Sequence, residues 1–123
     1  MKTVSTDKAP AALGPYSQAQ ITNGFVFCSG QVGINPETGA VAEGIEAQAN
    51  QVFKNLSEIL KAAGSDISKV VKTTVFIKDM NDFGTVNGIY AEYFTEPFPA
   101  RSCVEVARLP KDVLVECEAI AEL

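Results

Sequence analysis

The hydrophobic period of this chain changes along its length, and the change limits the folds that the chain can adopt. Residues 16–22 and 25–32 are typical of strands, and Asn23-Gly24 between them is the strongest short-range signal of a β-hairpin. From Ile45 onwards, apolar residues instead recur at steps of three and four positions, which predicts an amphipathic helix that ends at Gly64. Such a chain is expected to pack helix against sheet.

The second half of the chain repeats this switch. The β-branched, alternating run 70–78 predicts a strand, and a second helix follows, which Asn81 or Asp82 can cap and which the prolines at 97 and 99 end. Two terminal strands then lie on either side of a turn at 109–112. This order predicts an α+β fold, in which a mixed sheet of five to six strands carries two helices on one face.

The opposite face of the predicted sheet is also apolar. Phe25 and Phe27 point to one side of their strand, and Val26 and Cys28 point to the other. A sheet face that is too apolar for water is usually buried against another subunit. We therefore expect a homo-oligomer.

Composition narrows the class of protein. The 123 residues are expected to form a single domain, residues 1–123. The net charge of −5 argues against nucleic acid as a partner, because its phosphates would repel the chain. No apolar run approaches the roughly 20 residues that span a bilayer, and the N-terminus lacks the apolar core of a secretory signal. Three cysteines without a paired spacing predict reduced thiols and a cytoplasmic protein.

The chain contains no histidine. Ser-His-Asp and Cys-His catalysis within the chain are therefore excluded, and no cluster of Asp and Glu predicts a metal site. Glycine-rich phosphate loops and dinucleotide fingerprints are absent from the sequence. The groups left for chemistry gather in the terminal strands, where an arginine and several carboxylates stand among the usual Val and Ile.

Four motifs, in order along the chain, resemble the RidA/YjgF family. They are Gly14-Pro15-Tyr16-Ser17-Gln18-Ala19, Ser29-Gly30-Gln31-Val32-Gly33, Pro99-Ala100-Arg101-Ser102 and Glu105-Val106-Ala107-Arg108-Leu109-Pro110. The resemblance runs nearly end to end, and the spacing between motifs fits as well. Members of this family are reactive-intermediate (imine) deaminases, also described as L-PSP-type endoribonucleases or translation inhibitors.

The resemblance implies a chorismate-mutase-like fold and a homotrimer whose sheets form a barrel-like core, with active sites in the clefts between subunits. It also implies an activity, the hydrolysis of 2-imino acids to 2-oxo acids and ammonia, for which no cofactor is needed. The substrates would be 2-iminopropanoate, a tautomer of 2-aminoacrylate, and 2-iminobutanoate. Such an enzyme would protect pyridoxal-phosphate enzymes from the reactive enamine that they release.

Arg101 and Glu116 are the strongest candidates for catalysis. The planar guanidinium of Arg101 matches a substrate carboxylate bidentately, whereas the alternative is a surface salt bridge. A glutamate can position and deprotonate the water that attacks an imine carbon, and alternation puts Glu116 on the face opposite Cys117. The alternative for Glu116 is a structural pair with a lysine. The resemblance implies the functional role for both residues.

Cys103 lies two residues after Arg101 and therefore shares its strand face. A nucleophilic thiolate is disfavoured because the chain has no histidine to activate it, and free cysteine is usually a small buried hydrophobe. The resemblance implies a third role, in which the backbone of Cys103 hydrogen-bonds the substrate while the thiol lines the pocket.

Four further residues are candidates for substrate binding. Tyr16 can close the pocket with its ring and donate through its hydroxyl, a role that the resemblance also implies. Ser29 and Gly30 follow an apolar strand, where a glycine allows the backbone to approach a ligand closely. Asn87 is polar within an apolar helix segment, and a cap or structural bridge explains it equally well.

Three functions from different classes remain. The first is the cofactor-free imine hydrolase. The second is an endoribonuclease or translation inhibitor, which the acidic charge and the lack of histidine disfavour. The third is a non-catalytic module that binds small carboxylates or acts as a chaperone. Arg101 together with Glu116 favours the first function over the third, because a carboxylate binder needs no water-activating base.

Overall fold

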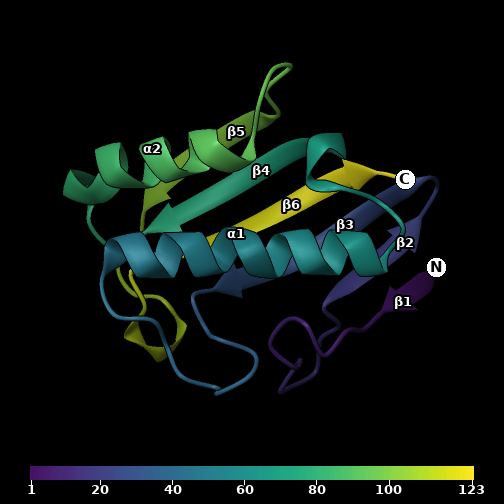
Figure 1. The fold of residues 1–123 in the computed structure, drawn as a ribbon, viewed down its shortest axis with the longest axis horizontal. Helices are drawn as coiled ribbons and strands as arrows, with labels where there is room; N and C mark the ends of the chain where they lie inside the picture. Colours follow the sequence, from purple (N-terminus) through teal and green to yellow (C-terminus); the bar gives the residue numbers. More distant parts are fainter.

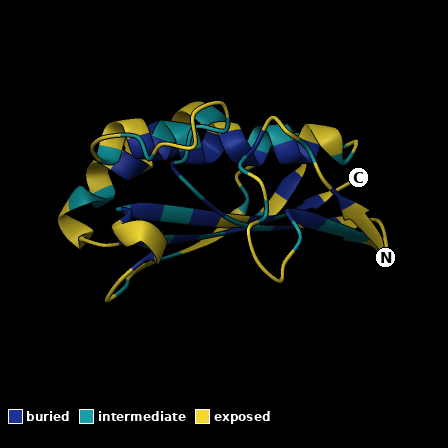
Figure 2. Ribbon diagram, turned by 90° about the horizontal axis from the view of Figure 1, so that it is seen from below, coloured by how far each residue is buried: buried dark blue, intermediate teal, exposed yellow.

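Six strands form one mixed sheet, and two α-helices lie together on one of its faces (Figures 1 and 2). The computed structural model describes residues 1–123. The strands are β1 (Lys2–Val4), β2 (Ala19–Thr22), β3 (Phe25–Val32), β4 (Val70–Ile77), β5 (Ala100–Glu105) and β6 (Val115–Glu122). The helices are α1 (Ile45–Ala62) and α2 (Phe83–Tyr93), with single 3₁₀ turns at Ile67–Lys69, Met80–Asp82 and Pro110–Asp112. The predicted α+β architecture is confirmed.

The strands do not lie in the sheet in their sequence order. Their spatial order is β1-β2-β3-β6-β4-β5, and only β4 and β5 run parallel. The last strand, β6, lies between β3 and β4, so that it separates the first hairpin from the second half of the chain. β5 is consequently an edge strand, with one side of its backbone unpaired.

The predicted hairpin joins β2 to β3. Asn23 and Gly24 both have positive φ, at 50° and 79°, which is the geometry of a type I′ turn and matches the twist of the two strands. The first strand of the hairpin is shorter than predicted, because regular pairing begins at Ala19 and not at residue 16.

The amphipathic helix predicted from Ile45 is α1, and its C-terminal signal is confirmed. Gly64 has φ of 85°, and Gly64 N–H donates to the Lys61 carbonyl at 3.0 Å. Ser65 N–H donates to the Leu60 carbonyl at 2.9 Å. These two bonds are the Schellman arrangement, which satisfies carbonyls at the end of the helix.

The predicted capping of α2 is wrong in its detail. Asp82 occupies the N-cap position, but its side chain makes no capping hydrogen bond. The carboxylate that caps this region is Asp79, which accepts from Asn81 N–H at 2.9 Å and starts the 3₁₀ turn that leads into the helix. The chain enters α2 through that turn, so the helix needs no capping side chain of its own.

The two faces of the sheet differ. One face packs against the helices, and its buried residues include Val26, Val75 and Cys117. The other face carries no helix, and Figure 2 shows both helices on the same side of the strands. Phe25 and Phe27 remain 38% and 43% exposed. Neither helix is long and apolar enough to cross a membrane.

Candidate active site

Arg101 lies on the edge strand β5 and points toward the helices. It pairs with Thr73 of β4, whose buried side chain faces α2, and residues paired across two strands share a face. Its guanidinium carbon lies 4.7 Å from the centre of the Tyr90 ring and 5.5 Å from that of Phe83. Its Nη1 donates to Asn87 Oδ1 at 2.7 Å. The side chain is therefore held by α2.

No carboxylate neutralises Arg101. The two ion pairs of the chain are Lys61 with Glu58 and Arg108 with Asp112, so the predicted alternative of a salt bridge at Arg101 is not what the chain forms. Its one hydrogen-bond partner, Asn87, is neutral. Arg101 also lines a hollow of about 410 Å³, together with Asn87, Tyr90, Ala91, Phe98 and Pro99, and its guanidinium keeps further N–H donors beyond the one that Asn87 uses. A small anion in this hollow would be attracted by the positive charge of Arg101, which no carboxylate of the chain neutralises.

Cys103 lies on the same face as Arg101, as predicted. It pairs with the buried Val75 and packs against the hydrophobic core. Burial raises the pKa of the Cys103 thiol, although the charge of Arg101 acts in the opposite direction. A raised pKa does not favour the nucleophilic thiolate. Cys103 is not among the residues that line the hollow at Arg101, so its role as a wall of the pocket stays a prediction.

Glu116 lies on the other face of the sheet. Its neighbours Val115 and Cys117 are fully buried under the helices, so the side chain of Glu116 points away from them. The carboxylate lies over Gly30 of β3: a Cβ placed on Gly30 would come within 2.1 Å of Glu116 Oε1. We predicted that Gly30 would let a ligand approach the backbone closely. The structure shows that Gly30 also makes room for the glutamate, and its approach to a ligand stays a prediction.

The environment of Glu116 favours its protonated form. Partial burial, and secondarily the negative charge of Glu118, raise the pKa of the Glu116 carboxyl above its ordinary value. No lysine pairs with it, so the predicted structural alternative is not observed within the chain. A carboxylate of raised pKa is a stronger base once it is ionised, which suits proton transfer from water.

Tyr16 and Ser29 line a second hollow of about 440 Å³, together with Phe27 and residues of β2. Tyr16 is half exposed and its ring folds back over Gly14. The Ser29 hydroxyl donates to the Ser17 carbonyl at 2.5 Å, so its proton serves to fix the segment that carries Tyr16. The fold places both predicted residues beside one hollow, but the Ser29 hydroxyl proton is already used there.

The candidate residues form two groups on opposite faces of the sheet. Arg101, Asn87 and Cys103 lie on the helix face of the β4–β5 edge. Glu116 and Gly30 lie at the β3–β6 pair, on the face without helices. Within one chain, the arginine and the glutamate do not meet.

The comparisons with known proteins identify the family. Residues 6–123 match the family described as Endoribonuclease L-PSP. A Salmonella typhimurium protein named 2-iminobutanoate/2-iminopropanoate deaminase is 57% identical over 123 aligned residues, which cover 98% of this chain and 96% of that protein. This chain belongs to the RidA/YjgF family.

Solved structures of family members have the same fold. The crystal structure of RidA from an Antarctic Psychrobacter species superposes with a TM-score of 0.98, at 46% identity and with all of both chains covered. Escherichia coli TdcF with bound serine gives a TM-score of 0.96 at 44% identity, over 100% of this chain and 99% of that one. The predicted RidA/YjgF fold is therefore confirmed.

Sequence reasoning missed two residues of the arginine site, Phe83 and Tyr90. Neither was predicted to take part in the site. With Asn87 they occupy positions i, i+4 and i+7, which is one stripe of a helix. The sequence did offer one signal, since Asn87 is a polar residue between two aromatic residues of the same stripe. This pattern could have predicted that the stripe faces the charged side chain of Arg101. Glu105, which had no predicted task, accepts from Met80 N–H at 2.8 Å and anchors the turn before α2.

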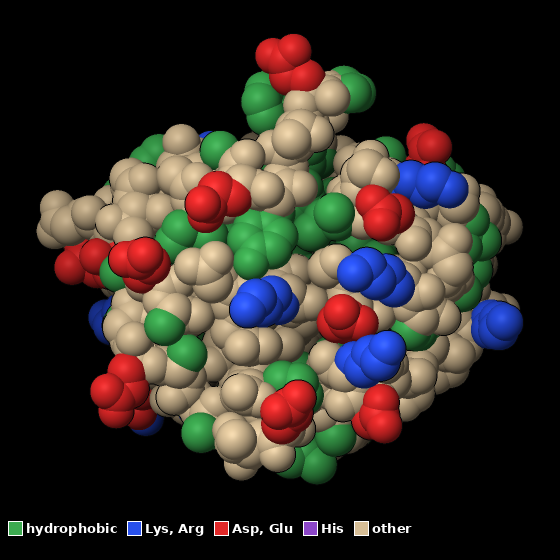
Figure 3. Space-filling view, viewed as in Figure 1, with side chains coloured by type: hydrophobic (Ala, Val, Ile, Leu, Met, Phe, Trp, Pro, Cys, Tyr) green, Lys and Arg blue, Asp and Glu red, His purple; other side chains and the backbone are tan.

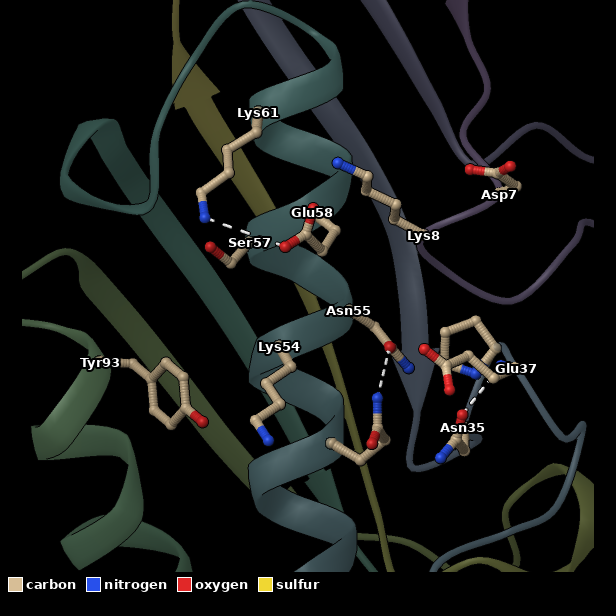
Figure 4. Close-up of a pocket in the computed structure, with 12 residues that line it drawn as sticks. Asp7, Lys8, Asn35, Glu37, Lys54, Asn55, Ser57, Glu58, Lys61 and Tyr93 are labelled. Carbon is tan, nitrogen blue, oxygen red and sulfur yellow. Dashed lines mark hydrogen bonds and ion pairs between the residues drawn. The ribbon is translucent and has the colours of Figure 1, made fainter.

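A third hollow, of about 760 Å³, contains none of the predicted site residues. It lies along the outer side of α1, where Lys54, Lys61 and Lys8 stand among Glu58, Glu37 and Asp7 (Figure 4). Its positive and negative side chains balance, and Asn55 there is used to hold the carbonyls of Val32 and Ile34. No three Cys, Asp or Glu residues are grouped so that they could hold a metal ion.

Proposed function

We propose that this member of the RidA/YjgF family hydrolyses 2-imino acids such as 2-iminobutanoate and 2-iminopropanoate. The reaction consumes the imine and one water, and it releases the 2-oxo acid and ammonia. The observation that carries the proposal is that the chain holds both an arginine that no carboxylate neutralises, Arg101, and a partly buried glutamate of raised pKa, Glu116, on the two faces of one sheet. The name of the Salmonella relative, at 57% identity, supports the same activity.

The two groups would divide the reaction between them. Arg101 would hold the substrate carboxylate through its free N–H groups, beside the backbone and thiol of Cys103. The TdcF structure with bound serine, a small molecule with one carboxylate, supports this kind of ligand. Glu116 would take a proton from water as its oxygen attacks the imine carbon, and pass that proton to the nitrogen, which gives a carbinolamine. It would then carry the proton of the new hydroxyl to the same nitrogen as the C–N bond breaks, so that ammonia leaves and the C=O bond of the 2-oxo acid forms. Water and a carboxylate are sufficient for both steps, so the proposal needs no cofactor.

We further propose that the site forms between two chains of a homotrimer. Arg101 and Glu116 lie on opposite faces of one sheet, so one chain alone does not complete the site. The exposed Phe25 and Phe27 on the face of Glu116 supply apolar surface for such an interface. Tyr16, Ser29 and Gly30 would then come from the chain that provides Glu116, and Asn87 from the chain that provides Arg101.

The surroundings fit a small anionic substrate better than RNA. On the helix face, basic side chains are interspersed with acidic ones and do not gather into a patch (Figure 3). The net charge is −5 and histidine is absent. The family description as an endoribonuclease keeps RNA cleavage as the alternative, to be tested with the same variants. The three cysteines are free, which supports the proposal of a reducing, cytoplasmic location. We also propose that residues 1–123 are a single domain.

The deciding experiment is a coupled assay in which an amino-acid oxidase or threonine dehydratase generates the imine. We expect the protein to accelerate release of the 2-oxo acid above the rate in buffer. Arg101→Ala should lower kcat/KM by about 10²-fold, since it removes a charge-assisted bidentate contact. Glu116→Gln should lower kcat by at least about 10²-fold and spare 2-oxobutanoate binding. The matched control is Glu122→Gln, the same change on the same face of β6. Unchanged turnover in both site variants would refute the proposal.

A mixing experiment tests the two-chain site. Arg101→Ala chains and Glu116→Ala chains are each expected to be inactive. Unfolded together and refolded as mixed oligomers, they should regain about a quarter of wild-type turnover, because one interface in four then joins an intact arginine to an intact glutamate. No recovery in confirmed mixed oligomers would place both groups in one chain.

A further inference from the structure

Helix α2 presents one stripe of side chains to Arg101. Phe83, Asn87 and Tyr90 lie at i, i+4 and i+7, and all three contact the guanidinium. Figure 1 shows α2 lying alongside β5, the strand that carries the arginine. Asn87 accepts a single hydrogen bond, which fixes one nitrogen of the guanidinium but leaves its plane free to turn. The orientation of the plane must come from the ring beneath it.

Tyr90 is the ring closest to the guanidinium, and it is fixed from its other sides. Phe53 of α1 meets it edge-on, with centroids 5.7 Å apart, and Phe94 packs at 4.3 Å. Its hydroxyl shares a hydrogen bond of 2.8 Å with the hydroxyl of Thr73, a residue with no exposed surface. Thr73 is the β4 partner of Arg101 itself. The same strand position therefore sets both the backbone of the arginine and the ring on which its side chain lies.

We infer that Tyr90 and Thr73 are positioning residues, which orient the Arg101 guanidinium so that its free edge is presented to the substrate carboxylate. The inference rests on the proposed function for the identity of the substrate. A guanidinium over an aromatic face within about 6 Å is attracted by the ring, and this attraction fixes its plane without neutralising its charge. A bidentate carboxylate contact requires that plane to be defined. A carboxylate partner in the place of Tyr90 would compete with the substrate.

Two conservative substitutions remove the hydrogen bond between Tyr90 and Thr73 and keep the aromatic ring of residue 90. Tyr90→Phe removes the hydroxyl and Thr73→Val removes its partner. Each should raise KM for 2-iminobutanoate, and Kd for 2-oxobutanoate, by about three- to tenfold, the size of one net hydrogen bond. The value of kcat should stay within about twofold, since the carboxylate is held equally in the ground and transition states. The double variant should be no worse than either single one, because both act through one bond.

Tyr93→Phe is the matched control. Tyr93 lies on the same helix, packs against the same Phe53 at 5.3 Å and also uses its hydroxyl, which donates to Asn50. The rings that lie against the Arg101 guanidinium are those of Phe83 and Tyr90, and not that of Tyr93. Tyr93→Phe should therefore leave KM and kcat unchanged. In an Arg101→Lys background, Tyr90→Phe should have no further effect on KM, because an ammonium has no plane to orient.

A direct measurement separates this inference from the proposed function. The nuclear magnetic relaxation of the Arg101 Nε–H group reports the order of the guanidinium without any ligand. Tyr90→Phe and Thr73→Val should lower its order parameter, and Tyr93→Phe should not. An unchanged order parameter in both variants overturns the positioning role, whatever the activity. A wild-type protein that fails to hydrolyse the imine refutes the proposed function, while a lowered order parameter would still support the positioning of Arg101.

Discussion

The Gly30→Ala substitution should lower the turnover of this protein and leave its stability almost unchanged. The added Cβ would lie 2.1 Å from Glu116 Oε1 and 2.9 Å from Glu116 Cδ. The carboxylate oxygen must move by about 1.3 Å before it reaches ordinary van der Waals distance. A misplacement of about 1 Å in a reacting group can cost about 10²-fold in rate, or about 2.7 kcal/mol of activation free energy. We therefore expect kcat for 2-iminobutanoate to fall by about 10²-fold.

The stability of the Gly30→Ala variant should change little. The only atoms in the way belong to the far end of a flexible side chain, and Gly30 does not have a positive φ. An alanine that fits its backbone conformation can even stabilise a protein by about 0.4–1 kcal/mol through the unfolded state. The free energy of unfolding, measured by urea denaturation, should stay within about 1 kcal/mol of wild type.

The assay compares initial rates of 2-oxobutanoate release with the rate in buffer subtracted. The decisive comparison is the same substitution in a Glu116→Gln background, where Gly30→Ala should cost less than about twofold, because the group that it displaces no longer acts as a base. Wild-type turnover in the single variant would show that the carboxylate is not used where it lies. An equal loss in both backgrounds would show that Gly30 acts through something other than Glu116.

Three further predictions concern neighbouring features. Gly33→Ala places a Cβ 2.8 Å from the backbone Cα of Gln48, which cannot swing away, so the free energy of unfolding should fall by about 1–3 kcal/mol in urea denaturation; an unchanged midpoint would contradict this. Gly88→Ala meets no atom within 4 Å on α2 and should raise that free energy by about 0.5–1 kcal/mol, whereas a loss would reveal a hidden contact. Glu118→Gln removes the negative charge that is the second cause of the raised pKa of Glu116, so this pKa should fall. The titration midpoint of the Glu116 carboxyl measured by NMR, and the pH below which activity is lost, should both move down. A midpoint that stays or rises would exclude this coupling.

Local chemistry made much of the fold predictable. Asn-Gly at 23–24 can adopt positive φ at both positions, and few other dipeptides close a two-residue hairpin as easily. Gly64 ends α1 for the same reason, since it enters the left-handed region without a steric cost. In both places a few neighbouring residues decide the geometry, so the sequence alone was sufficient.

Long-range pairing was not predictable in the same way. β1 spans three residues and exists only because it pairs with β2, so it carries no periodic pattern of its own. The insertion of β6 between β3 and β4 joins segments about 45 to 90 residues apart, and no local pattern encodes that choice. Alternation correctly placed Arg101 with Cys103, and Glu116 opposite Cys117. It could not relate one strand to another, because that requires the register of Arg101 with Thr73.

The separation of Arg101 from Glu116 has a chemical consequence of its own. An arginine and a glutamate on the same face of neighbouring strands attract each other, and a pair formed in the folded chain would neutralise both. Here the sheet itself stands between them: the arginine rests on an aromatic ring and a neutral amide, and the glutamate lies half-buried over a glycine, near a like charge. Each group keeps the property that imine hydrolysis would require, a free positive fork in one case and a basic carboxylate in the other. If the two groups meet only where chains assemble, Glu116 of the same chain does not form an ion pair with Arg101. The guanidinium of Arg101 then remains available to the substrate carboxylate.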